Sequence, residues 1–287
     1  MDIINKYKEK IVSRLGDNLE ALILVGSFAR GEAVIYESNG KKELISDIEF
    51  WAVVKDLSIA KTISFDNNVS LGFTTLKHLR QLKPYIYTIE VKKFGKVLYG
   101  HSNILNLIPD YSYENIEPID GFILLNNRIV EQLILLNRIE DVQGVNQYDF
   151  DKSYIQLVNS LLVFNRRYRS LYPDKQDEFR RFYKDSDIGL LNKVDEAFAS
   201  VKQQSGVAIR QDEALKKWQE VREHFRKVWI REKRTLGKVK CWIKFLSLGK
   251  PLQFLIYQKA ANLYFSDEYH NKQKRDIVIK EWKKHIK

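Results

Sequence analysis

The sequence predicts an α+β fold, with a small mixed sheet flanked by helices over residues 1–118 and an all-α helical bundle over residues 119–287. Short apolar or alternating runs, bounded by turn residues, dominate the first part, and this pattern is typical of β-strands. After Pro109 and Pro118, apolar residues recur at helical spacing and strand signals largely disappear. The change in pattern predicts two domains, which suits a chain of 287 residues.

The composition is that of a globular protein, with 44% hydrophobic and 30% charged residues. No apolar run approaches the roughly 18 residues of a membrane span, and residues 1–11 lack the apolar core of a secretory signal. A single cysteine, Cys241, cannot form an internal disulfide, which is typical of a reducing compartment. We therefore expect a cytoplasmic protein.

The net charge of +11 is concentrated in the second domain. Residues 1–120 hold 15 Lys and Arg against 16 Asp and Glu, whereas residues 121–287 hold 33 against 21. A basic surplus attracts polyanions such as nucleic acid, but solvated helix faces carry the same surplus. The run Arg166-Arg167-Tyr168-Arg169 is open to both interpretations.

Local patterns predict each element of the first domain. A helical apolar pattern predicts a helix over residues 2–15, and Ser38-Asn39-Gly40 is a hairpin turn signal between residues 33–37 and 41–45. A second short helix is expected over residues 74–82. Runs with strand character occupy residues 21–25, 47–54, 69–73, 85–93 and 97–99.

The second domain is predicted to contain long helices followed by shorter ones. Helical periodicity covers residues 119–139, 154–172, 187–203 and 213–234. Gly237, Gly249-Lys250-Pro251 and Ser266-Asp267 divide the remainder into shorter helices. In the helix over 213–234, an apolar stripe that includes Trp218, Phe225 and Trp229 is expected to be core rather than a base-stacking platform.

The sequence places a Gly26-Ser27 turn after one strand and two acids, Asp47 and Glu49, at the start of another. Side chains at i and i+2 of a strand share a face, so the two carboxylates can converge on divalent cations. Gly26 allows the backbone to approach phosphates, and Ser27 together with the N–H groups of the following helix start can bind them. This combination suits phosphoryl or nucleotidyl transfer.

Glu90 is the expected third metal ligand, placed mid-strand in the run over 85–93. Asp56 and Asp66 compete for that role, and a salt bridge to Lys92 or to a nearby arginine is the alternative for Glu90.

Arg30 lies one turn beyond Ser27, where its guanidinium can reach a phosphate oxygen or instead brace Glu32 or Asp47. The five histidines show no zinc-binding spacing. Glu131, on the first helix of the second domain, is considered as an acceptor base only by analogy.

The segments V-G-S-F-A-R-G-E at 25–32 and S-D-I-E-F at 46–50 resemble the signature of the DNA polymerase beta-like nucleotidyltransferase superfamily. With the helical domain that follows, they are similar to two-domain antibiotic adenylyltransferases of the kanamycin nucleotidyltransferase type. The resemblance covers about residues 20–100, and the helical remainder matches only as an architecture. Ser27 and Asp47 are further apart than in compact members, and the hairpin would absorb the difference.

The resemblance implies a nucleotidyltransferase domain, two Mg²⁺ ions, and transfer of NMP, AMP from ATP, to a hydroxyl of a small-molecule acceptor. It also implies roles for the matching residues. Those implied to be catalytic and metal-binding are Asp47, Glu49 and Glu90, and those implied to bind nucleotide are Gly26, Ser27, Arg30 and Ser46. A tRNA or protein acceptor, as in antitoxin-like nucleotidyltransferases, and a non-catalytic nucleotide-binding protein are the alternatives.

Overall fold

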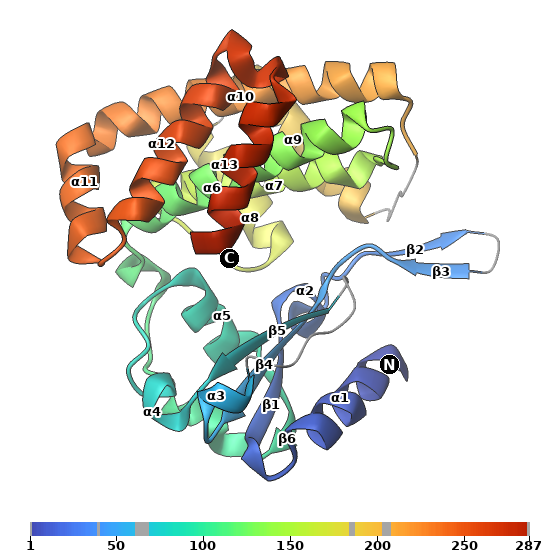
Figure 1. Ribbon diagram of the computed structural model, residues 1–287, viewed down its shortest axis with the longest axis vertical. Coiled ribbons are helices and arrows are strands. Elements are labelled where there is room, and N and C mark those ends of the chain that lie inside the picture. Colours follow the sequence, from blue (N-terminus) through green and yellow to red (C-terminus); the bar gives the residue numbers. More distant parts are fainter. Residues whose placement is uncertain (1, 39–40, 61–68, 184–186, 203–207, 286–287) are drawn as a thin grey trace. The chain divides into compact units, whose positions relative to one another are not determined.

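The computed structural model describes residues 2–38, 41–60, 69–183, 187–202 and 208–285 (Figure 1). Contacts divide the chain into two compact units, Met1–Ile116 and Glu117–Lys287. The first unit contains all four strands of a mixed sheet and the second is mainly helical, so the predicted α+β class is confirmed.

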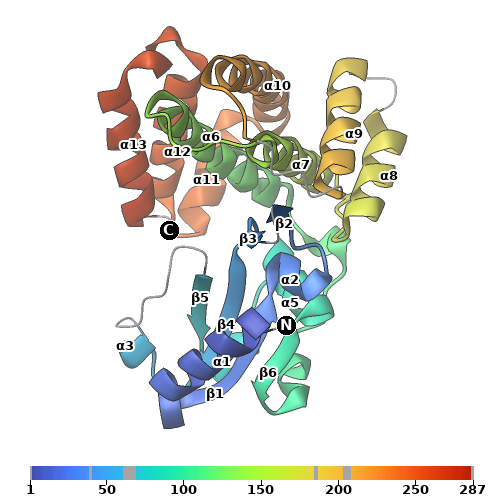
Figure 2. The same cartoon turned by 90° about the vertical axis from the view of Figure 1, so that its right-hand side faces the viewer.

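The sheet of the first unit has the order β5-β4-β1-β6 (Figure 2). β1 pairs antiparallel with both β4 and β6, while β4 pairs parallel with β5. The central strands β1 and β4 are therefore each hydrogen-bonded on both sides. The four strands are β1 (Leu19–Val25), β4 (Ile48–Val54), β5 (Val69–Thr74) and β6 (Lys96–Gly100).

Alternating side chains of β4 enter two separate hydrophobic clusters, one on each face of the sheet. Ile48 and Phe50 pack in the cluster that includes Ile11 of α1 (Asp2–Leu15). Val53 packs on the opposite face, in the cluster that includes Leu79 and Val91. The second cluster draws on α4 (Leu76–Leu79) and α5 (Ile86–Phe94). Because side chains alternate along a strand, Glu49 belongs to the same face as Val53.

The predicted hairpin before β4 is confirmed. β2 (Ile35–Ser38) pairs antiparallel with β3 (Lys41–Leu44), from Ile35 opposite Leu44 to Ser38 opposite Lys41. The turn residues Asn39 and Gly40 lie outside the described residues. At the base of the hairpin, the Val34 carbonyl accepts hydrogen bonds from the N–H groups of Ile45 and Ser46, at 3.2 and 3.1 Å.

The strand predicted over residues 85–93 is wrong, because the chain forms α5 there. Alternating β-branched and aromatic residues carried the strand prediction, but such preferences yield to tertiary packing. β1 is already hydrogen-bonded to β4 on one side and to β6 on the other, so it has no free edge for a further strand. Residues 86–94 pack on a face of the sheet instead. Buried Thr88, Ile89 and Val91 form the inner side of this helix.

The second unit, Glu117–Lys287, contains eight α-helices in its described residues. The helix predicted over 154–172 begins and ends earlier, and Arg166 has a left-handed backbone (φ 55°) that separates it from a further helix. As predicted, Trp218 and Phe225 are fully buried core residues. The helices are α6 (Pro118–Glu140), α7 (Gln147–Phe164), α8 (Tyr172–Tyr183), α9 (Ile188–Lys202), α10 (Gln211–Leu236), α11 (Lys238–Ser247), α12 (Pro251–Phe265) and α13 (Lys272–His285).

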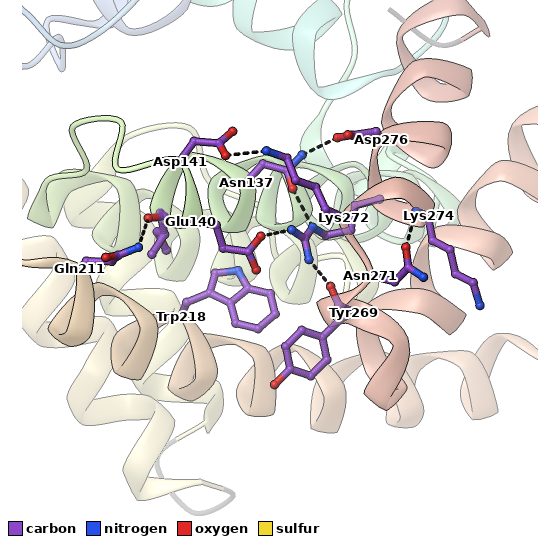
Figure 3. A network of polar contacts seen from close by, with 12 residues as sticks. Asn137, Glu140, Asp141, Gln211, Trp218, Tyr269, Asn271, Lys272, Lys274 and Asp276 are labelled. Atoms are coloured by element: carbon purple, nitrogen blue, oxygen red, sulfur yellow. Dashed lines mark hydrogen bonds and ion pairs between the residues drawn. The ribbon is translucent and has the colours of Figure 1, made fainter.

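A buried arginine joins the last helix to the first helix of this unit (Figure 3). Arg275 of α13 is fully buried and forms an ion pair with Glu140 of α6. Its Nε donates to Asn137 Oδ1 at 2.6 Å, and its Nη1 donates to the Tyr269 carbonyl. A buried guanidinium needs such a complete set of acceptors. None of the helices in the described ranges is long and apolar enough to cross a membrane.

Candidate active site

The turn between β1 and α2 (Gly26–Arg30) brings the Gly26-Ser27 motif to one end of the central strands. Gly26 has a left-handed φ of 67°, which favours glycine because a Cβ is strained there. The short helix ends at Gly31, also left-handed (φ 76°), and the Glu32 N–H donates to the Ser27 carbonyl at 2.9 Å. Ser27 therefore lies in the first turn of α2, where N–H groups have no acceptor within the helix.

Asp47 and Glu49 lie beside this turn because β4 runs antiparallel to β1. Asp47 directly precedes β4, and Glu49 is paired with Val25, the last residue of β1. A Cβ on Gly26 would overlap Glu49 Oε2, so the glutamate carboxylate lies against the glycine backbone. Both acids are exposed to solvent. The two halves of the sequence motif, 20 residues apart, thus form one structural unit.

Arg30 lies between two carboxylates. Its Nε donates to Glu32 Oε2 at 2.9 Å and its Nη1 donates to Glu90 Oε2 at 2.6 Å. The three side chains are only 10–14% exposed, so solvent screens these pairs weakly. Arg30 therefore forms the ion pair with Glu32 that was one of its predicted alternatives. Glu90 forms the salt bridge to a nearby arginine that was its alternative to metal binding, and that arginine is Arg30.

Glu90 reaches the site from a helix and not from the predicted neighbouring strand. It belongs to α5, which contacts both α2 and β1. Among the described residues, no group of three or more His, Cys, Asp and Glu side chains is arranged to hold a metal ion. Glu90 is instead paired with Arg30, and the expected metal-ligand set of Asp47, Glu49 and Glu90 stays a prediction.

Asp56, one of the two competing acids, does not join Asp47 and Glu49. Asp56 lies beyond the other end of β4, where its carboxylate accepts hydrogen bonds from the Ser58 N–H at 2.8 Å and the Ser58 hydroxyl at 2.7 Å. These bonds lower the pKa of Asp56, the backbone bond most, because they stabilise the carboxylate. Asp66 lies outside the described residues.

Ser46 is buried and has a structural contact. Its side-chain oxygen accepts a hydrogen bond from the Val34 N–H at 2.9 Å, and only 5% of the residue is exposed. This bond holds the chain at the base of the hairpin, immediately before Asp47. Through this hydrogen bond, Ser46 can fix the backbone position of Asp47.

Pattern analysis missed a group of aromatic rings on the same side of the sheet. Trp51, two residues after Glu49 on β4, meets the ring of Tyr87 edge-on, with centroids 5.9 Å apart. Tyr87 is 46% exposed and stacks on Tyr85 with a centroid distance of 5.8 Å. The i, i+2 spacing of Glu49 and Trp51 was enough to predict that these two side chains share a face of the strand. The tyrosines could not be predicted to lie near them, because their position depends on residues 86–94 being helical.

Two groups considered in the second unit have partners within it. Glu131 forms an ion pair with Arg128 on the same helix. In the 166–169 segment, Arg167 and Arg169 both pair with Glu178, at 2.9 and 3.4 Å.

Comparison with known proteins gives limited similarity. No protein-family model matches the chain, and no curated protein matches it. Among solved structures, the chain is similar to spectinomycin adenyltransferase AAD(9) from Enterococcus faecialis, determined with ATP and spectinomycin. The identity is 15%, the TM-score is 0.46, and the alignment covers 81% of this chain and 98% of that one. At this level of similarity, no residue role or substrate passes from that enzyme to this chain.

Proposed function

We propose that the chain is a magnesium-dependent nucleotidyltransferase that transfers a nucleoside monophosphate, AMP from ATP, to a hydroxyl of a small molecule. The observation that carries the proposal is the contact between Glu49 and Gly26. In this contact the exposed carboxylate of Glu49 lies against the turn, next to the first-turn N–H groups that we assign to phosphate binding.

The donor set fits magnesium. Mg²⁺ is a hard cation that is commonly bound by one or two carboxylates together with substrate phosphates, so Asp47 and Glu49 would be sufficient protein ligands. When bound, the ion neutralises charge that develops on the transferred phosphoryl group. The role of the two acids is to hold the ion on the side of the sheet that faces the turn.

Other residues around the turn have supporting roles in this proposal. The Ser27 hydroxyl and the N–H groups at the start of α2 would bind phosphate oxygens. Arg30 and Glu90 hold α2 against α5 through their ion pair, which keeps the turn in place. We assign Ser46 to the positioning of Asp47, since its hydroxyl is bonded to the backbone of Val34.

A small-molecule acceptor agrees better with the second unit than a polyanion does. Glu178 neutralises much of the charge that Arg167 and Arg169 would offer to nucleic acid. No observation on the described residues specifically favours an RNA or protein acceptor.

The proposal is tested by incubating the protein with ATP labelled at the α-phosphate, Mg²⁺ and a panel of hydroxylated acceptors. We expect a labelled acceptor and pyrophosphate. Asp47→Asn and Glu49→Gln should each lower the rate about 100-fold or more, because each removes charge stabilisation of the transition state. Asp17→Asn, an exposed acid before the opposite end of β1, is the matched control and should retain the wild-type rate.

Two outcomes would contradict the proposal. Transfer that persists in the Asp47→Ala/Glu49→Ala double variant would remove the metal-site assignment. Stabilisation by ATP and Mg²⁺ without product from any acceptor would identify a nucleotide-binding protein without turnover.

A further inference from the structure

The helical unit contains a cavity that is separate from the Gly26 turn. It lies among α7, α9 and α10 and has a volume of about 260 Å³. Pockets for drug-sized ligands have volumes of about 300–1,000 Å³, so this cavity suits a compound of few non-hydrogen atoms.

Two buried polar side chains on one face of α7 line this cavity. Asp151 is 3% exposed and Tyr154, one turn further on, is 5% exposed. Asp151 Oδ1 accepts a hydrogen bond from Gln147 Nε2 at 2.7 Å. Among the residues that the structure describes, Asp151 Oδ2 and the Tyr154 hydroxyl have no hydrogen-bond partner. Because buried polar atoms in proteins are nearly always paired, this arrangement indicates a missing donor.

The lysines around the cavity are already neutralised. Lys193 Nζ lies 3.3 Å from Glu220 and 3.4 Å from Glu196, and Lys217 lies 3.5 Å from Glu213. Burial works to lower the pKa of Lys193, but its bonds and charge interactions with the two glutamates outweigh burial and raise it. The ammonium groups are therefore held by other carboxylates.

The carboxylate of Asp151, in contrast, is stabilised by the charge of Lys217 but is in direct contact with no cation of the described residues. No ion pair within 4 Å includes it in the part of the chain that the structure describes. Burial raises the pKa of Asp151 most and the charge of Glu196 adds to the rise, while the hydrogen bonds of Ser200 and Gln147 and the charge of Lys217 oppose it. A bound cation would remove the cost of burying this charge.

We propose that this cavity binds a small primary ammonium compound, whose N–H groups donate to Asp151 Oδ2 and the Tyr154 hydroxyl oxygen. Burial raises the pKa of Tyr154, which keeps its hydroxyl neutral. Glu196 and Glu220 are exposed at the edge of the cavity and share Lys193, so these three side chains leave one net negative charge there. A cation is favoured over an anion for that reason. The site is independent of the proposed nucleotidyl transfer and is tested without ATP.

The test is isothermal titration calorimetry with 1,4-diaminobutane, using 1,4-butanediol as a neutral probe of the same length. We expect the diamine to bind and the diol to bind at least ten-fold more weakly. Asp151→Asn should weaken diamine binding about ten-fold or more, because it removes a charged acceptor. Tyr154→Phe should weaken it several-fold. Asp174→Asn, an exposed acid of α8 outside the cavity, is the matched control and should bind as the wild type does.

Each outcome decides the proposal. Absence of diamine binding to the wild-type protein would overturn it, as would equal affinity for the diamine and the diol. Binding that is unchanged in both Asp151→Asn and Tyr154→Phe would place the diamine elsewhere on the surface. If Asp151→Asn does not fold, as judged by circular dichroism, Tyr154→Phe and the diol comparison still give the answer.

Discussion

The carboxylate of Glu49 occupies the space that a side chain on Gly26 would need. The two residues are brought together because Glu49 pairs with Val25 across the central strands, and Gly26 follows directly. The left-handed backbone therefore favours glycine, and a Cβ at this position would push the end of the Glu49 side chain aside.

This contact predicts that Gly26→Ala is more damaging than Gly31→Ala. Both glycines are left-handed, but a Cβ on Gly31 meets no atom within 4 Å. Gly31→Ala should lower the free energy of unfolding by about 1 kcal/mol from backbone strain alone. Gly26→Ala should lower it by at least about 2 kcal/mol. Urea denaturation measures both, and equal losses would show that Glu49 moves aside without cost.

A double variant isolates the contact itself. In Gly26→Ala/Glu49→Ala, the clash is gone while the backbone strain remains. We expect the loss of stability to return toward that of Gly31→Ala, so that the effects of the two single substitutions are not additive.

Substitution of Glu49 should weaken metal binding, whereas substitution of Glu90 should not. Glu90 holds Arg30 at 2.6 Å, so Glu90→Gln should lower stability by about 1–3 kcal/mol and leave Mn²⁺ affinity in the presence of ATP within about two-fold. Glu49→Gln should weaken Mn²⁺ binding about ten-fold or more. Electron paramagnetic resonance of free Mn²⁺ provides the measurement. A loss of Mn²⁺ binding in a fully stable Glu90→Gln variant would make Glu90 a metal ligand after all.

The Arg275 network of Figure 3 predicts a large stability effect far from the candidate site. Arg275→Met leaves Glu140 without its buried partner and should lower the free energy of unfolding by about 3–5 kcal/mol. The control is Lys272→Met on the same helix, whose ion pair with Asp141 is exposed and should contribute less than about 1 kcal/mol. Similar losses in the two variants would mean that burial of Arg275 adds nothing.

Asp120 should make stability depend on pH. Burial raises its pKa from 3.8 to about 7, with the charge of Glu117 adding to the effect and Lys244 and Lys250 opposing it. Between these two values the folded protein holds a proton that the unfolded chain has lost, so stability falls as pH rises from about 4 to about 7. Above that range the contribution of this group is constant.

The Asp120→Asn variant tests this sign. The neutral amide should match the wild type at about pH 3, below both pKa values, and be more stable than it at about pH 8, as measured by urea denaturation at both values. If the wild type instead gains stability relative to Asp120→Asn as pH rises, folding lowers the pKa of Asp120, and the prediction is wrong.

Local patterns were sufficient for much of the first unit. Alternation along residues 47–54 identified the central strand β4, and Ser38-Asn39-Gly40 located the hairpin between β2 and β3. They failed at residues 85–93, where β-branched and aromatic residues alternate in a segment that is helical. That segment takes its structure from what it packs against, since β6 already fills the neighbouring edge of β1.

The sequence by itself determined the pair of acids and the Gly-Ser turn, because strand periodicity and glycine backbone freedom are local properties. Only the tertiary structure decided that Glu49 lies against Gly26, that Arg30 is held by Glu32 and Glu90, and that Asp151 lines a cavity. These relationships join residues on different elements. They depend on strand pairing and helix packing, which bring distant parts of the chain together and which no local pattern encodes.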